Sequence, residues 1–351
     1  MKLLPRSRWA RAALVVPMLV AVGFLLWWRG PDWGVVYHAF HFVNWAWVTF
    51  AIGLNLVSVL VRSLAWRLTI AQALDPPQPR YGHVFSAFSI GLLANAVLPG
   101  RIGELARVAV LRRRLPEHGP GTSGALVGTV LAHRLFDLFP VLLLLAYVLW
   151  TAKIPHWAVT SVVVVAALGG LLFTAAVMGA RRGHRATVDS ARPFRRLLAM
   201  ARQGLSVLRS PLPAAAAIVL QCAGWFLQLL AVYVAMRAFD IHAPLPAAGL
   251  VLLLMNVATI FPLWPGNFGL LQAAVALPLV QYGVAYSTGF AYGIVLQVLE
   301  MAVGVGVGLL FLAREGLSFA VLRTMPDATE FPVEGHPPPP EAASARARVS
   351  G

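Results

Sequence analysis

The chain has 351 residues, of which 59% are hydrophobic and only 12% are charged, and its mean hydropathy is +0.75. Soluble domains carry roughly 25% charged residues, so this composition excludes an ordinary soluble protein. The formal net charge is +15, but the positive residues gather in short connections beside apolar segments. That distribution is typical of the positive-inside rule in membrane proteins and argues against nucleic-acid binding. Cys222 is the single cysteine, so we predict neither a disulfide framework nor a thiolate metal cluster.

Apolar runs that reach the roughly 20 residues needed to cross a bilayer recur along the chain. We predict about six spans within residues 1–314, at 12–28, 45–61, 122–150, 157–178, 212–236 and 286–312. The basic start of the chain and the arginine-rich connection 181–209 mark the cytoplasmic side, so both termini are expected in the cytoplasm and the first span is expected to stay uncleaved. Arg62 and Trp66 are expected at a cytoplasmic membrane surface. Residues 315–351, with four successive prolines, predict a disordered tail.

The two remaining apolar regions, 84–111 and 247–281, are each interrupted by a Pro-Gly-x-x-Gly sequence. Proline lacks an N–H and glycine lacks a Cβ, so a helix that reaches such a pair ends there. The arms on either side have about a dozen residues, too few to span a bilayer. We therefore predict two re-entrant hairpins, broken at Pro99, Gly100 and Gly103 in the first and at Pro265, Gly266 and Gly269 in the second.

The predicted orientation of the two hairpins is opposite. With the N-terminus in the cytoplasm, the first hairpin opens to the cytoplasm and the second opens to the outside. Each is preceded by one span and followed by another. The fold predicted is therefore an all-α polytopic membrane protein built from two inverted-topology repeats. Transporters with discontinuous helices and a binding site near the membrane midplane have this organisation.

Charged and amide side chains gather around these breaks, where they are costly unless they bind something or each other. Broken helix ends expose N–H groups that suit an anionic group such as a lipid phosphate. Arginines add charge-assisted donors, and the carboxylates balance them or bind a cationic headgroup amine. The predicted substrate-binding residues are Asn95, Arg101, Glu104, Arg107, Arg134, Asp137, Asn267, Gln272 and Glu300. Arg134 and Asp137 are also i, i+3 neighbours that can pair within one helix, and for Arg62 a ligand role and a surface-anchoring role both stay open.

The run from Asn95 to Arg107 reads Asn-x-x-x-Pro-Gly-Arg-x-Gly-Glu-x-x-Arg, and Arg134-x-x-Asp137 follows it. Together with the second Pro-Gly-x-x-Gly, these residues resemble the lysylphosphatidylglycerol synthase transmembrane region family. The resemblance implies a flippase-like protein of the bacterial inner membrane that moves aminoacylated or glycosylated lipids between leaflets. Full-length synthases carry a soluble aminoacyl-transfer domain, and no foldable segment follows Arg314, so we do not expect an enzyme. The family usually has Glu at the position of Gln272, which argues against a mechanism that needs a carboxylate there.

Three other functions are compatible with the sequence. An inverted repeat suits a secondary transporter of a small solute equally well. A membrane-embedded enzyme would use Glu104 or Asp137 as general base on a lipid-linked substrate, although no nucleophile triad, metal-ligand spacing or nucleotide loop is present in the sequence. A non-transporting subunit would recruit a synthase through the 181–209 connection or through the tail. We predict no cofactor and no metal; the expected partners are lipids with anionic, aminoacylated or glycosylated headgroups, a second copy of the chain, or a lipid-synthesising enzyme.

Overall fold

The computed structural model describes residues 31–97, 102–115, 122–153, 160, 211–260 and 267–316. Within these ranges every regular element is a helix and there is no strand. The spans expected at 12–28 and 157–178 and the tail from residue 317 lie outside the described residues. The same holds for several residues at the predicted breaks, namely Pro99, Gly100, Arg101, Pro265 and Gly266.

The helices follow one another as α2 (Trp33–His41), α3 (Trp45–Ala73), α4 (Tyr81–Val97), α5 (Gly103–Arg113), α6 (Thr122–Phe136), α7 (Leu138–Thr151), α10 (Pro211–Arg237), α11 (Leu245–Ile260), α12 (Leu270–Val280) and α13 (Tyr286–Arg314). Four segments are long and apolar enough to cross a membrane: α3, α6 with α7, α10 and α13. They correspond to four of the spans expected from the sequence. An all-helical membrane protein is therefore confirmed.

Helix α3 is longer than predicted, because it continues past residue 61 to Ala73. The side chain of Trp66, near this end of α3, is fully buried inside the protein. Arg62 likewise sits within the helix, with a side chain only 18% exposed, because it finds a carboxylate partner there. The start of α3 is fixed by Asn44, whose side-chain oxygen accepts a hydrogen bond from the N–H of Ala46 at 3.1 Å.

The predicted span 122–150 is divided into α6 and α7 at Asp137. Pro140, in the first turn of α7, has no N–H to donate to the carbonyl of Phe136, so a regular hydrogen bond between the two helices is missing. The division places the Asp137 side chain at a junction, where it is buried.

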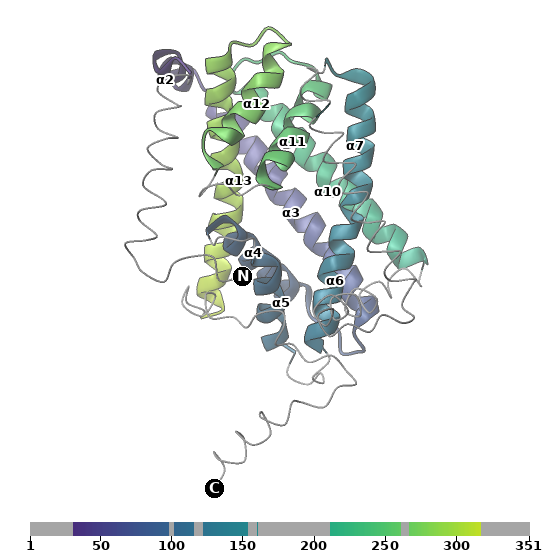
Figure 1. The fold of residues 1–351 in the computed structure, drawn as a ribbon. Coiled ribbons are helices and arrows are strands. Elements are labelled where there is room, and N and C mark those ends of the chain that lie inside the picture. Colours follow the sequence, from purple (N-terminus) through teal and green to yellow (C-terminus); the bar gives the residue numbers. More distant parts are fainter. Residues whose placement is uncertain are drawn as a thin grey trace, which may run out of the picture.

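The short helices lie in opposite halves of the molecule (Figure 1). Helix α4 packs against the lower half of α13 and α5 packs against α4, whereas α11 and α12 lie in the upper half, beside α7 and α13. Helices α3 and α10 run along each other and make the most extensive contact between any two elements of the described residues. The contacts follow a repeated pattern: α3–α4 matches α10–α11, α4–α5 matches α11–α12, and α5–α6 matches α12–α13.

Glycines allow the arms of the first pair to touch at backbone distance. A Cβ on Gly91 of α4 would lie 2.9 Å from the carbonyl oxygen of Gly103, and a Cβ on Gly103 would overlap the carbonyl oxygen of Gly91. On the other side of α4, a Cβ on Gly308 of α13 would lie 2.8 Å from the carbonyl oxygen of Ser89. Small residues at helix crossings permit this close approach in membrane proteins. Helix α4 is therefore held between α5 and α13.

Candidate functional site

Five charged side chains of alternating sign form a continuous series, here called the ion-pair chain: Arg107, Glu104, Arg134, Asp137 and Arg62. Arg107 pairs with Glu104 at 2.5 Å, and Glu104 also pairs with Arg134. Arg134 in turn lies 3.2 Å from Asp137, which lies 3.4 Å from Arg62. The series joins α5, α6 and α3, and it includes the i, i+3 pair expected between Arg134 and Asp137.

The local structure explains how each charged side chain is positioned in the ion-pair chain. Helix α5 begins at Gly103, directly after the predicted break, so Glu104 falls in its first turn, where the helix dipole favours an acidic residue. Arg107 follows one turn later and faces the same side. Asp137 comes from the α6–α7 junction and Arg62 from the middle of α3. Three separate elements thus converge on one cluster.

Asp137 is the most highly coordinated group of the ion-pair chain. Besides its two arginines it accepts hydrogen bonds from two side chains of α10: Trp225 Nε1 at 2.8 Å and Gln221 Nε2. The Gln221 amide also lies 3.4 Å from Nε2 of the buried His133. Taking a carboxylate out of water costs a large free energy of desolvation, and these hydrogen bonds and ion pairs offset that cost. Asp137 therefore links α10 firmly to α3 and α6.

Arg107 is different, since its guanidinium is only partly satisfied. The residue is 4% exposed, and its charged end lies over the rings of Trp66, at 4.7 Å, and Phe88, at 5.4 Å. Its Nη2 atom lies 2.5 Å from Oε2 of Glu104 in the ion pair, whereas its Nε atom has no hydrogen-bond partner among the described residues. Buried donors are nearly always bonded, so this arginine is suited to receive acceptor atoms from a ligand.

A narrow cavity of about 30 Å³ opens beside the ion-pair chain, lined by Arg62, Glu104, Arg107, His133 and Arg134 together with residues of α4. This volume holds about one water molecule. A larger ligand group therefore enters only if the surrounding helices separate. Arg134 has a 47% exposed side chain, so it lies at the open edge of the cluster, whereas Arg107 lies at its buried end.

Three amide residues that were predicted to bind substrate form hydrogen bonds with the backbone at the helix breaks. Asn95 accepts a hydrogen bond from the N–H of Gly103 at 2.9 Å and so caps α5. Asn267 has φ of 46° and donates to the carbonyl of Ala258 at 3.1 Å. Gln272 accepts from the N–H of Gly269 at 2.6 Å and donates to Gln297 at 2.6 Å. None of the three belongs to the ion-pair chain in the described structure, but Asn95 also lines the cavity beside it.

Glu300 of α13 lies next to the cluster, half-buried, with a hydrogen bond to Gln228 and an electrostatic interaction with Arg62. Arg101, at the first break, lies outside the described residues. Sequence reasoning missed the residues of α10 that complete the site. Their spacing carries a signal, because Gln221, Trp225 and Gln228 are at i, i+4 and i+7 and share one face of an apolar span.

The fold and this cluster define a class: a polytopic helical membrane protein that keeps a connected set of charged side chains buried among its helices. The family described as Lysylphosphatidylglycerol synthase TM region matches residues 11–308. Because the match covers most of the chain, the protein belongs to this family. Comparison with curated proteins gave no significant match, and neither did comparison with solved structures.

Proposed function

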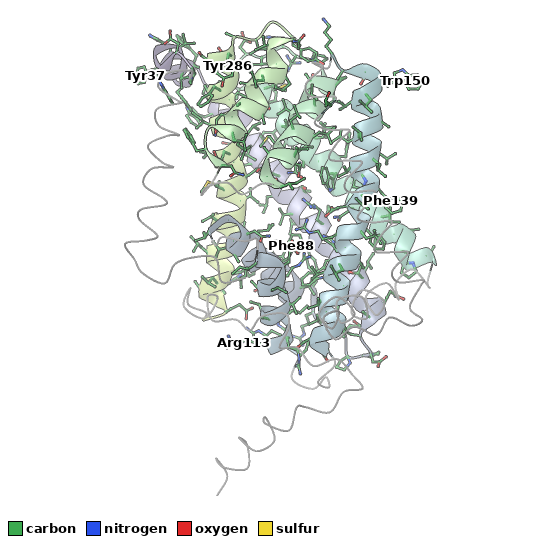
Figure 2. All side chains as sticks on the ribbon, viewed as in Figure 1. Tyr37, Phe88, Arg113, Phe139, Trp150 and Tyr286 are labelled. Carbon is green, nitrogen blue, oxygen red and sulfur yellow. The ribbon has the colours of Figure 1, made fainter. Side chains whose placement is uncertain are left out.

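We propose that this chain is a flippase-like protein of the bacterial inner membrane that moves a lipid with an aminoacylated or glycosylated headgroup between leaflets. The observation that carries the proposal is the buried guanidinium of Arg107 at one end of the ion-pair chain: its Nη2 atom contacts Glu104, and its Nε atom has no hydrogen-bond partner among the described residues. Phe88, which contacts Arg107, lies between the end marked by Arg113 and the end marked by Tyr286 and Trp150 (Figure 2). A position between the two ends of the molecule suits a transported headgroup, because transporters with inverted repeats bind their substrates near the membrane midplane.

We further propose that α3 to α7 and α10 to α13 form two inverted repeats with re-entrant hairpins, α4 with α5 and α11 with α12. The repeated contact pattern and the positions of the two hairpins in opposite halves support this arrangement (Figure 1). Both termini are placed in the cytoplasm, as the arginine distribution favours. Rocking of one repeat against the other would open the cluster alternately to the two leaflets.

The charged side chains of the ion-pair chain can exchange one another for charged groups of a ligand without leaving any charge unpaired. A lipid phosphate would accept hydrogen bonds from Arg107 and from Arg134. A headgroup ammonium would then pair with the Glu104 carboxylate that those arginines release. Because every charge keeps a counter-charge during the exchange, the large cost of an isolated buried ion is avoided. We propose that the chain acts by this binding and release and performs no covalent chemistry on the lipid.

The test is leaflet exchange of a fluorescent lysine-esterified phosphatidylglycerol in proteoliposomes, measured by the fraction that an impermeant quencher reaches over time. Arg107→Gln is expected to slow exchange by about tenfold or more, because it removes charge-assisted hydrogen bonds to the phosphate. Arg237→Gln is the matched control, since Arg237 also stacks on an aromatic ring, that of Tyr233 at 5.4 Å, but lies at the end of α10. Equal exchange by the two variants, or none by the unmodified protein, would contradict the proposal.

A further inference from the structure

A second cavity lies away from the ion-pair chain, at the end of the molecule that Arg113 marks in Figure 2. It has a volume of about 210 Å³ and is lined by Val110, Arg113, Arg114 and Glu315. Helices α5 and α13 both end beside it. The arginine distribution assigns this end to the cytoplasmic side of the membrane. It is the region where a lipid headgroup of the inner leaflet would meet the protein.

Glu315 occupies the cavity wall and holds three helices together. Its Oε2 atom accepts from Arg114 Nε at 2.9 Å and lies 2.6 Å from Arg114 Nη2, while its Oε1 atom accepts from the hydroxyl of Ser86 at 2.9 Å. Ser86 belongs to α4, Arg114 follows α5 and Glu315 follows α13. One carboxylate therefore ties both arms of the first hairpin to the last span. Its side chain is only 12% exposed.

Arg113 faces the same cavity and forms no ion pair with any residue that the structure describes. The cavity thus contains two guanidinium groups and a single carboxylate, which already serves Arg114 and Ser86. Both α5 and α13 present their carbonyl ends here, and those ends stabilise the arginines but do not attract an anion. Any affinity for an anion therefore depends on the two arginine side chains.

We propose that this cavity binds the phosphate of an anionic lipid of the cytoplasmic leaflet, held between Arg113 and Arg114 in competition with Glu315. The guanidinium of Arg114 contacts the Glu315 carboxylate through two nitrogens, and a phosphate is bound by the same geometry. Basic pockets between membrane helices on the cytoplasmic side suit anionic headgroups. A lipid bound here separates Glu315 from Arg114 and frees α5 from α13. The site is distinct from the ion-pair chain and does not depend on the transport proposed for it.

The test is binding of phosphatidylglycerol to the full chain in detergent, measured by native mass spectrometry. Replacing both arginines, Arg113→Gln with Arg114→Gln, is expected to weaken binding by about tenfold or more. The matched control replaces Arg67 and Arg80 by Gln, two arginines near the same end with no carboxylate partner among the described residues, and is expected to leave binding unchanged. Equal losses in the two double variants would mean non-specific attraction by charge and would overturn the proposal.

A second variant keeps the test valid even if loss of both arginines harms folding. Glu315→Gln removes the competing carboxylate, so phosphatidylglycerol is expected to bind more tightly, which misfolding cannot produce. Asp75→Asn is the matched control: it changes the net charge by the same amount as Glu315→Gln and is expected to leave phosphatidylglycerol binding unchanged. Unaltered binding by Glu315→Gln would refute the competition. Inorganic phosphate tests the source of the anion: binding as tight as that of phosphatidylglycerol would overturn the lipid assignment.

Discussion

Substituting Gly224 by alanine tests how Arg62 is positioned in the ion-pair chain. Gly224 lies on α10 where the side chain of Arg62 crosses it, and a Cβ there would overlap Arg62 Cγ and lie 3.1 Å from Cδ. The backbone of α10 cannot simply shift away, because the carbonyl of Gly224 accepts a hydrogen bond of 2.7 Å from the buried Ser58 hydroxyl of α3. The added methyl must therefore displace the Arg62 side chain, which carries the contact with Asp137.

Two opposing effects determine how much Gly224→Ala changes the free energy of unfolding. Overpacking a tight contact costs about 1–3 kcal/mol, and moving Arg62 weakens one ion pair of a buried carboxylate. In the other direction, alanine is the better helix former by roughly 1 kcal/mol. We expect a net loss of about 1–2 kcal/mol in the free energy of unfolding, measured by denaturant unfolding in detergent, together with slower lipid exchange.

Gly53→Ala and Gly306→Ala are the matched controls, because a Cβ at either glycine would meet no atom within 4 Å and both residues are exposed on long helices. Only the helix-propensity gain remains there, so both variants are expected to be as stable as the unmodified chain or slightly more stable. The reasoning is refuted if Gly224→Ala behaves like the controls. It is refuted also if Gly224→Ala lowers stability but leaves lipid exchange at its full rate, because Arg62 would then not matter to the site.

Three further substitutions test other parts of the cluster. Asp137→Asn leaves the partly buried Arg62 without its carboxylate partner, while Arg134 keeps Glu104, and is expected to cost about 3–5 kcal/mol in denaturant unfolding. A loss under about 1 kcal/mol, the level of an exposed pair, would show that burial does not strengthen this ion pair. Gly103→Ala forces α4 and α5 apart and is expected to lower thermal stability strongly, whereas Gly82→Ala, whose Cβ would meet no atom within 4 Å, should not. Trp66→Leu removes the ring that packs against Arg107 and the 3.1 Å hydrogen bond to Thr129, so the free energy of unfolding is expected to fall by about 1–3 kcal/mol. An unchanged unfolding midpoint would count against a structural role for this ring.

The sequence predicted the helical membrane class, the short helices around the two breaks and four charges of the cluster. These follow from local rules: proline and glycine end helices, and i, i+3 spacing brings Arg134 to Asp137. The contribution of α10 did not follow from local rules, because Gln221 and Trp225 are 84 and 88 residues away from Asp137. Only packing of α3 against α10 brings them to it.

The sequence did not predict the hydrogen bonds that three amide side chains make at the helix breaks. Asn95, Asn267 and Gln272 stand beside the predicted breaks, and the sequence alone favours them as ligands. In the structure their side chains satisfy N–H and C=O groups that the interrupted helices leave open. A broken helix needs such partners before any ligand does, so a polar residue next to a break is first a cap. Arg107 differs from these residues, because its buried Nε atom has no hydrogen-bond partner in the described part of the chain.

Transport by this chain requires a lipid headgroup to enter beside the ion-pair chain, at the cavity near Arg107. Because Cys222 is the single cysteine of the chain, a Cys222→Ser background allows one reporter thiol to be placed at Leu92, which lines that cavity. A water-soluble maleimide is expected to label Leu92→Cys, and lysine-esterified phosphatidylglycerol is expected to slow this labelling but not that of Asp240→Cys, an exposed position in the connection between α10 and α11. Labelling of Leu92→Cys at the same rate with and without the lipid would contradict headgroup entry at this cavity.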